Sequence, residues 1–232
     1  TSCDKCGSSD ANALYEDGSQ WCFSCETYNH PDKERNSVVI QQQPRQTQML
    51  SIGITEALSE RGISEDTCRT YGVTIQNNKQ IYPYYDQSGK HVANKVRHPD
   101  KNFHSEGQLP PAGLFGQQLF QQSGKYITIT EGEIDAMSAY EMLGSRWAVV
   151  SIKNGAQSAV KDVKAQFEYL NRFENIVLCF DADEHGQKAA NAVAQIFEPN
   201  KCRIMHLVMK DANEYLKANQ RELFTKAWWE AK

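Results

Sequence analysis

The sequence lacks any apolar segment long enough to cross a membrane. Its longest unbroken apolar run is Ile176–Phe180, whereas a membrane-spanning helix needs about 20 such residues. An excess of positive charge is also lacking. The net charge of −4 argues against an overall basic coat for nucleic acid, but a local basic strip can still bind it. The 10% aromatic content and the mixed charges are not those of a disordered chain. A length of 232 residues predicts one or two domains with a substantial core.

A phosphate-binding loop of the G-x-x-x-x-G-K-[ST] type is also absent. The dipeptide Gly124-Lys125 is followed by Tyr126, and no glycine stands at the required upstream position. This segment is therefore not that of a P-loop ATPase or a helicase motor.

Cysteines are concentrated at the start of the chain. Four of the seven form two C-x-x-C pairs with fifteen residues between them, at Cys3, Cys6, Cys22 and Cys25. This doubled spacing is typical of a tetrahedral structural zinc site. Two redox motifs, or disulfides in a secreted protein, are the alternatives, but neither a βαβ context nor a targeting signal supports them. The remaining cysteines are predicted to lie in the core: Cys68, Cys179 and Cys202.

The composition predicts three regions along the chain. Residues 1–29 form a zinc module in which two short strands, at 13–15 and 20–23, flank a turn at Asp17-Gly18. Residues 30–51 form a polar, flexible linker. Residues 52–232 form a compact domain, divided into an N-terminal subdomain at 52–124 and a second subdomain at 125–232.

Hydrophobic periodicity predicts the elements of the compact domain. Two short helices are expected at 54–61 and 64–71, followed by a hairpin with strands at 80–86 and 92–97. Strands are then expected at 126–130, 147–151, 175–180 and 202–208, and helices at 134–143, 156–173, 186–197 and 212–218. Strands that alternate with helices predict an α/β fold with a parallel sheet covered by helices on both faces. A terminal helix at 221–232 is predicted to bury Leu223, Phe224, Ala227 and Trp228.

Acidic residues follow three of the four strands of this predicted sheet. In an open parallel sheet, ligands bind beyond the carboxyl ends of the strands. A single acid there is more often a helix N-cap or a solvated loop residue, but repeated acids repel one another unless a divalent cation lies between them. Magnesium prefers such oxygen ligands and usually also holds substrate phosphates, which indicates phosphoryl transfer. The acids that carry this prediction are Glu131, Asp135, Asp181, Asp183 and Asp211.

The combined motifs resemble the Toprim fold and, more closely, the primase half of the bifunctional primase–helicases of T-seven-like phages. The resemblance covers nearly the whole chain. It rests on C-D-x-C-G-S-S-D at 3–10, K-V-R-x-x-D-K-N-F at 95–103, L-F-G at 114–116, T-E-G-E-I-D at 130–135, D-x-D at 181–183 and K-D-A-N-E at 210–214.

The resemblance implies a DNA primase, a nucleotidyltransferase that makes short RNA primers on single-stranded DNA from ribonucleoside triphosphates. Glu131 would be the acid–base residue that activates the primer 3′-hydroxyl. Magnesium or manganese would be held by Asp181 and Asp183, with Asp211 and Asp135 in support. The implied partners are a helicase, fused or separate, and a replicative DNA polymerase in the cytoplasm of the infected host cell.

Two groups of residues are predicted to bind nucleotide or template. Lys95, Arg97 and Lys101 form a local basic strip that suits phosphates, although lysines on a solvated strand edge are the alternative. In the zinc module, Asp17 and Trp21 are candidate base contacts. Ser19 stands where the family has a histidine that helps to read the template, so the template preference is expected to differ or to depend on other residues.

Two other functions are compatible with parts of the pattern. One is a Toprim nuclease or topoisomerase, although the chain has no separate region for the catalytic tyrosine of a topoisomerase. The other is a non-catalytic protein of the recombination-mediator type, which pairs zinc with a Toprim-like fold and binds DNA. Retention of Glu131, Asp181 and Asp183 favours the enzyme over the pure binder.

Overall fold

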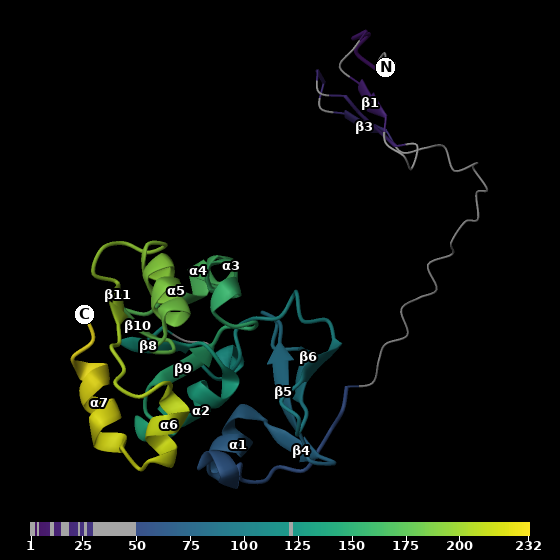
Figure 1. Ribbon diagram of the computed structural model, residues 1–232. Coiled ribbons are helices and arrows are strands. Elements are labelled where there is room, and N and C mark those ends of the chain that lie inside the picture. The colour runs from purple at the N-terminus through teal and green to yellow at the C-terminus, as the bar shows by residue number, and fades with distance from the viewer. Residues whose placement is uncertain are drawn as a thin grey trace. The chain divides into compact units, whose positions relative to one another are not determined.

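The computed structural model describes residues 3, 5–9, 12–14, 19–22, 24–25, 27–29, 50–120 and 123–232. The chain divides into two units, Thr1–Gln46 and Thr47–Lys232, and each is described by itself (Figure 1). This division falls inside the predicted linker, of which residues 30–49 lie outside the described residues, as does Asp17. Within the described part of the chain, no helix combines the length and the apolar character that a membrane crossing requires.

The first unit contains a small antiparallel sheet of three strands in the order β1-β2-β3. Trp21, in the central strand, lies opposite Ala13 on one side and Tyr28 on the other. The third strand was not expected from the sequence. The strands are β1 (Asn12–Leu14), β2 (Gln20–Cys22) and β3 (Thr27–Asn29).

The second unit begins with an antiparallel sheet in the order β4-β5-β6-β7. The β5–β6 hairpin was predicted, whereas β7 was not. Helix α1 begins after Ser64, whose hydroxyl accepts the amide hydrogen of Thr67 and so acts as the expected N-cap. The elements are η1 (Ser59–Arg61), α1 (Glu65–Tyr71), β4 (Thr74–Gln76), β5 (Lys79–Tyr85), β6 (His91–Arg97), β7 (Phe103–Gly107) and η2 (Gln117–Leu119).

The helix predicted at 54–61 is wrong except for its last turn. Ile54 instead exchanges two backbone hydrogen bonds with Ile75, at 2.9 and 2.8 Å, and is therefore extended. Gly53 permits this approach, because a Cβ atom there would lie 2.4 Å from the Ile75 carbonyl oxygen. Tertiary pairing thus outweighs the local helical pattern.

The rest of the unit contains a parallel sheet in the order β11-β10-β8-β9, which confirms the predicted α/β Toprim-type architecture. Helices cover both faces (Figure 1). The elements are β8 (Tyr126–Thr130), α2 (Glu133–Met142), β9 (Ala148–Ser151), η3 (Ala156–Ser158), α3 (Ala159–Ala165), α4 (Phe167–Leu170), β10 (Asn175–Cys179), α5 (Glu184–Ala194), β11 (Cys202–Ile204), α6 (Ala212–Lys217) and α7 (Arg221–Trp229).

Alternate strand residues enter two separate cores, one on each face of this sheet. Val149 and Val177 pack in the core that includes α2, α6 and α7. Ile129 and Leu178 pack in the core that includes α3 and α5. The strands are apolar without alternation because both of their faces are buried.

Three predicted elements differ in detail from the structure. The helix expected at 156–173 is broken into η3, α3 and α4, with Gln166 leaving the helical conformation between α3 and α4. The strand expected at 202–208 ends at Ile204, and the amide of Val208 donates to the Tyr215 hydroxyl instead of to a strand. In α7, Phe224 and Trp228 are buried as predicted, but Leu223 is 40% exposed because it lies off their shared stripe.

Candidate active site

The central feature of the second unit is the point where the strand order reverses. From β8 the chain passes through α2 to β9 on one side, and then reaches β10 on the other side of β8. Thr130 at the end of β8 lies opposite Cys179 at the end of β10. Glu131 and Asp181 therefore follow neighbouring strand ends, at the switch point where open α/β sheets bind their ligands.

Glu131 has one occupied and one unoccupied carboxylate oxygen. Its Oε1 atom accepts the backbone N–H of Ala156 at 3.1 Å. Its Oε2 atom is buried and has no hydrogen-bond partner. An unpartnered buried carboxylate oxygen is costly in a folded protein, so its retention indicates a role toward a ligand.

Three further carboxylates interact electrostatically with Glu131 or with one another: Asp135, Asp181 and Asp211. Burial, together with the charges of Asp211, Asp181 and Glu131, raises the pKa of Asp135 to about 8. Burial also raises the pKa of Asp181 to about 6, together with the charges of Glu131 and Asp211. The charges that raise these two pKa values come from the same small group of acids, which places Glu131, Asp135, Asp181 and Asp211 near one edge of the sheet.

Two of the predicted magnesium ligands also cap helices. Asp183 accepts the N–H of Gly186 at 2.8 Å as the N-cap of α5. Asp211 accepts the N–H of Glu214 at 2.9 Å as the N-cap of α6. Each cap uses one oxygen of the carboxylate. Asp183 contributes less than Glu131 and Asp211 to the raised pKa of Asp181.

The donor set fits a hard divalent cation. It offers carboxylate oxygens alone, it includes the unpartnered Oε2 atom of Glu131, and the mutual repulsion of its acids is what a cation would relieve. Among the described residues, however, only the cysteine sulfurs of the first unit form a group of three or more ligand atoms within 4.8 Å of one another, and these carboxylate oxygens are farther apart.

We expect the repulsion to appear as a pH dependence of stability in magnesium-free buffer. The folded protein holds a proton on Asp135 up to about pH 8, whereas the unfolded chain releases it near its ordinary value of 3.8. The free energy of unfolding should therefore fall between these values as pH rises, by up to about 1.4 kcal/mol per pH unit. Asp135→Asn cannot ionise and should flatten this slope while keeping an oxygen for the N–H of Asn213.

Urea unfolding at about pH 5 and about pH 8 measures this difference. The Asn variant should be more stable than the parent protein at the higher pH. Equal slopes for the two proteins would show that Asp135 does not carry the repulsion.

The predicted basic strip is divided by the structure. The Nζ atom of Lys95 lies 2.5 Å from Glu133 Oε1 and donates to the backbone carbonyl of Lys153 at 2.7 Å, and the Lys95 side chain is only 14% exposed. The Tyr84 hydroxyl donates to the same Glu133 oxygen at 2.6 Å. Lys95 thus forms a largely buried ion pair between the antiparallel sheet and the start of α2, and is not part of a solvent-facing strip.

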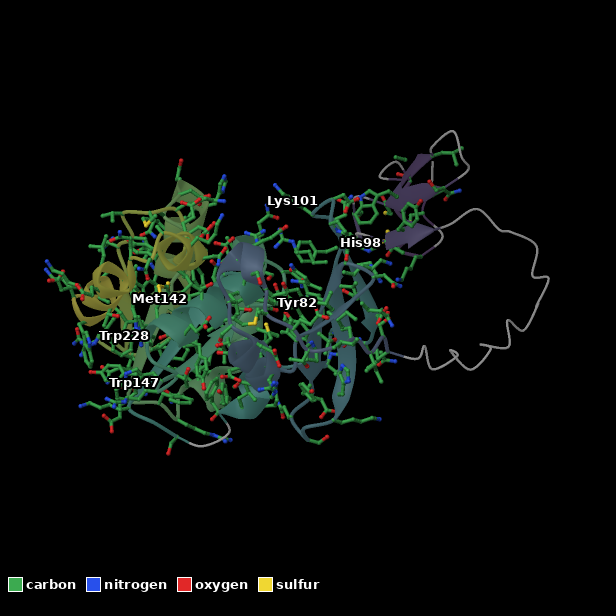
Figure 2. All side chains as sticks on the ribbon, turned by 90° about the horizontal axis from the view of Figure 1, so that it is seen from below. Tyr82, His98, Lys101, Met142, Trp147 and Trp228 are labelled. Atoms are coloured by element: carbon green, nitrogen blue, oxygen red, sulfur yellow. The ribbon has the colours of Figure 1, made fainter. Side chains whose placement is uncertain are left out.

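Arg97 and Lys101 remain near the surface of the β6–β7 hairpin, with an aromatic ring beside them. The guanidinium of Arg97 lies 5.6 Å from the ring centre of Phe103, whose side chain is 50% exposed. Figure 2 shows Lys101 and His98 on this part of the unit, while Trp147 and Trp228 lie on the opposite side. Sequence reasoning missed Phe103, although its place in the K-N-F motif beside the basic residues was a usable signal.

The four cysteines of the first unit come together as predicted, in a group that could hold a metal ion. Their sulfur atoms all lie within 4.8 Å of one another. The first pair sits on a tight turn in which the N–H of Gly7 donates to the carbonyl of Cys3 at 2.9 Å. Hydrogen bonds from the backbone of Cys6 and Lys5 lower the pKa of the Cys3 thiol to about 6, which favours the thiolate that zinc requires. The group therefore fits a structural zinc ion.

Comparisons with known proteins match both halves of the second unit. The family described as Toprim-like matches residues 128–216, and the family described as bacteriophage T7 DNA helicase/primase, N-terminal a+b fold, matches residues 53–107. A DNA helicase/primase of Enterobacteria phage T3 is 36% identical over 97% of this chain. The chain spans 42% of the length of that curated relative.

Solved structures agree with these matches. The primase fragment of the bacteriophage T7 primase-helicase protein is 36% identical with a TM-score of 0.72, and the match covers 98% of this chain and 97% of the other. Primase domains in a complex described as containing T7 lagging-strand DNA polymerase, an RNA/DNA hybrid and dTTP match at 37% identity with a TM-score of 0.73 over 79% of this chain and 97% of the matched chain. A DnaG catalytic core shares the fold at 13% identity, with a TM-score of 0.55 over 75% of this chain and 71% of that one.

Proposed function

Because this chain belongs to the primase–helicase family of T7-like phages, matching its primase fragment over nearly the whole length, we propose that it is a DNA primase. It synthesises short RNA primers on single-stranded DNA from ribonucleoside triphosphates. The observation that carries the proposal is the unpartnered Glu131 Oε2 atom at the edge of the sheet where the other acids gather.

In the proposed chemistry, Glu131 is the general base. Its Oε2 atom accepts the proton of the primer 3′-hydroxyl, while Oε1 stays bound to the N–H of Ala156 and so keeps the carboxylate oriented. Asp181, Asp183, Asp211 and Asp135 would hold magnesium or manganese. A bound cation of this kind neutralises charge on the triphosphate and lowers the barrier to phosphoryl transfer.

Template and nucleotide bind through two proposed surfaces. On the β6–β7 hairpin, Arg97 and Lys101 meet phosphates, and the exposed Phe103 ring offers a face on which a base can stack. In the first unit, Trp21 contacts template bases, and Asp17 is proposed for the same role. The zinc module at 1–29 thus selects the template, and an RNA polymerase domain at 52–232, with subdomains 52–124 and 125–232, carries the chemistry.

The related proteins support the proposed partners. A T7 complex contains primase domains with a lagging-strand DNA polymerase and an RNA/DNA hybrid, and the T3 relative carries a helicase in the same chain. We therefore propose a replicative polymerase and a helicase as partners, in the cytoplasm of the infected cell.

The direct test incubates the chain with single-stranded DNA, magnesium chloride and the four ribonucleoside triphosphates. Short RNA products that depend on both template and magnesium are the expected result. Cleavage of the DNA without RNA synthesis would instead identify a Toprim nuclease. Template binding with neither reaction would identify the non-catalytic binder.

The contrast between Lys101 and Lys95 tests the nucleic-acid surface. Lys101→Met should weaken single-stranded DNA binding similarly for all sequences and reduce the slope of log affinity against log salt by about one, with little change in stability because the side chain is exposed. Lys95→Met should instead lower the free energy of unfolding by about 3–5 kcal/mol, because Glu133 would stay buried without its partner.

Salt-dependent binding and urea unfolding of the two variants provide the measurement. Equal loss of stability in both would mean that the hairpin tip is structural. Unchanged DNA affinity in folded Lys101→Met would remove Lys101 from the proposed surface.

A further inference from the structure

Lys153 lies two residues after β9, and each of its polar groups makes a hydrogen bond. Its backbone N–H donates to Asp162 Oδ2 at 2.9 Å, and its backbone carbonyl accepts from Lys95 Nζ at 2.7 Å. Its own Nζ atom donates to the Ala112 carbonyl at 2.9 Å and lies 3.9 Å from Asp162 Oδ1. Lys153 and Asp162 are only 7% and 4% exposed. A buried pair with this many bonds fixes the backbone on which it lies.

The segment fixed in this way ends at the group that holds Glu131. After Lys153 the chain turns at Gly155, whose φ of +73° favours glycine. The next residue, Ala156, donates its backbone N–H to Glu131 Oε1. Asp162 holds the far side of the turn as well, because the Ser158 hydroxyl donates to its Oδ2 atom at 2.9 Å. Among the described residues, no other hydrogen bond or ion pair orients the Glu131 carboxylate.

We propose that Lys153 and Asp162 are positioning residues for Glu131. They fix residues 153–156 so that the N–H of Ala156 occupies Oε1 and leaves Oε2 open toward the acids of the switch point. The inference rests on the proposed function for its effect on catalysis, but the structural link from Asp162 to Ala156 can be measured without any reaction. Neither residue belongs to the motifs that the sequence analysis connected with catalysis.

The test compares three variants by two readouts. Asp162→Ala removes the acceptor of Lys153 N–H and of Ser158. Ser158→Ala removes the contacts of its hydroxyl with Asp162 and with the Gly155 carbonyl, and leaves the buried pair in place. Val163→Ala is the matched control, because Val163 is buried in the same helix but makes none of these bonds. The readouts are amide hydrogen exchange at Ala156, followed by NMR, and kcat and KM for ribonucleotides in primer synthesis.

Asp162→Ala should make the Ala156 amide exchange about tenfold faster, since its local opening is no longer restrained. It should lower kcat by about tenfold or more with a smaller change in KM, because a misplaced general base affects the chemical step. Ser158→Ala should shift both readouts in the same direction by about threefold. Val163→Ala should lower the melting temperature. The exchange rate of the Ala156 amide, compared with other amides, and kcat should both stay near the parent values.

Several results would overturn the inference. One is parent-like Ala156 exchange in Ser158→Ala, which is expected to fold even where Asp162→Ala does not. Another is an equal loss of kcat in Asp162→Ala and Val163→Ala, which would show general destabilisation instead of positioning. Faster Ala156 exchange in a protein that makes no primers under any condition would support the structural link and refute the proposed function, so the two failures are distinguishable.

Discussion

Glu131→Gln is expected to lower the rate of primer synthesis by about two to four orders of magnitude, the range of a lost general base. Glutamine is nearly isosteric, and its carbonyl oxygen can still accept the N–H of Ala156. The amide group at the position of Oε2 cannot take a proton from the 3′-hydroxyl. The measurement is the initial rate at saturating template and ribonucleotides.

The same substitution should not destabilise the protein in magnesium-free buffer. It removes one negative charge that raises the pKa values of Asp135 and Asp181, so the free energy of unfolding should be equal or slightly higher. A variant that melts much lower yet still makes primers would mean that Glu131 is structural, and the proposal would lose its chemical basis.

Asp181 and Asp183 provide matched controls for this experiment. Asp181→Asn should reduce synthesis strongly, because Asp181 lies in the coupled acid group. At Asp183 the choice of substitution separates two roles. Asparagine caps a helix nearly as well as aspartate, whereas alanine costs about 1 kcal/mol. Lost synthesis with unchanged stability in Asp183→Asn would identify a magnesium ligand, and full activity in this variant would identify a helix cap.

Cys22→Ser, or removal of zinc by a chelator, should unfold the first unit and abolish template-dependent priming. Among the described residues of that unit, the sheet has three strands of three residues each, which is too little to form a core, so we expect a metal to supply its stability. A structural zinc ion contributes about 10–16 kcal/mol in small modules of this kind. Cys22 is fully buried in the central strand, so its substitution removes a ligand and leaves a polar group in the centre of the module.

The second unit should remain folded in the same experiment, because it has its own two cores. Amide NMR signals of residues in β1, β2 and β3 should collapse to unfolded positions, while those of β8 and β10 stay in place. Addition of zinc to the chelated protein should restore the first set, whereas Cys22→Ser should recover poorly. Loss of both sets of signals together would show that the two units are not independent.

The sequence alone predicted the features that depend on short-range periodicity and spacing. The two C-x-x-C pairs predicted the cysteine cluster, because two tight turns suffice to present four sulfurs to one ion. The alternation of apolar strands and helices predicted the parallel sheet. The place of Glu131 and Asp181 directly after their strands predicted that they meet, since the carboxyl ends of parallel strands share an edge.

Only the tertiary structure decided which charged side chains face one another. Lys95 appears in the sequence as part of a basic strip, yet it pairs with Glu133 because the antiparallel sheet packs against the start of α2. Lys153 and Asp162 carried no signal at all, although the turn between them holds Glu131. Such pairings depend on how two sheets and their helices pack, and a local hydrophobic period reports which face of an element is buried without reporting what lies against that face.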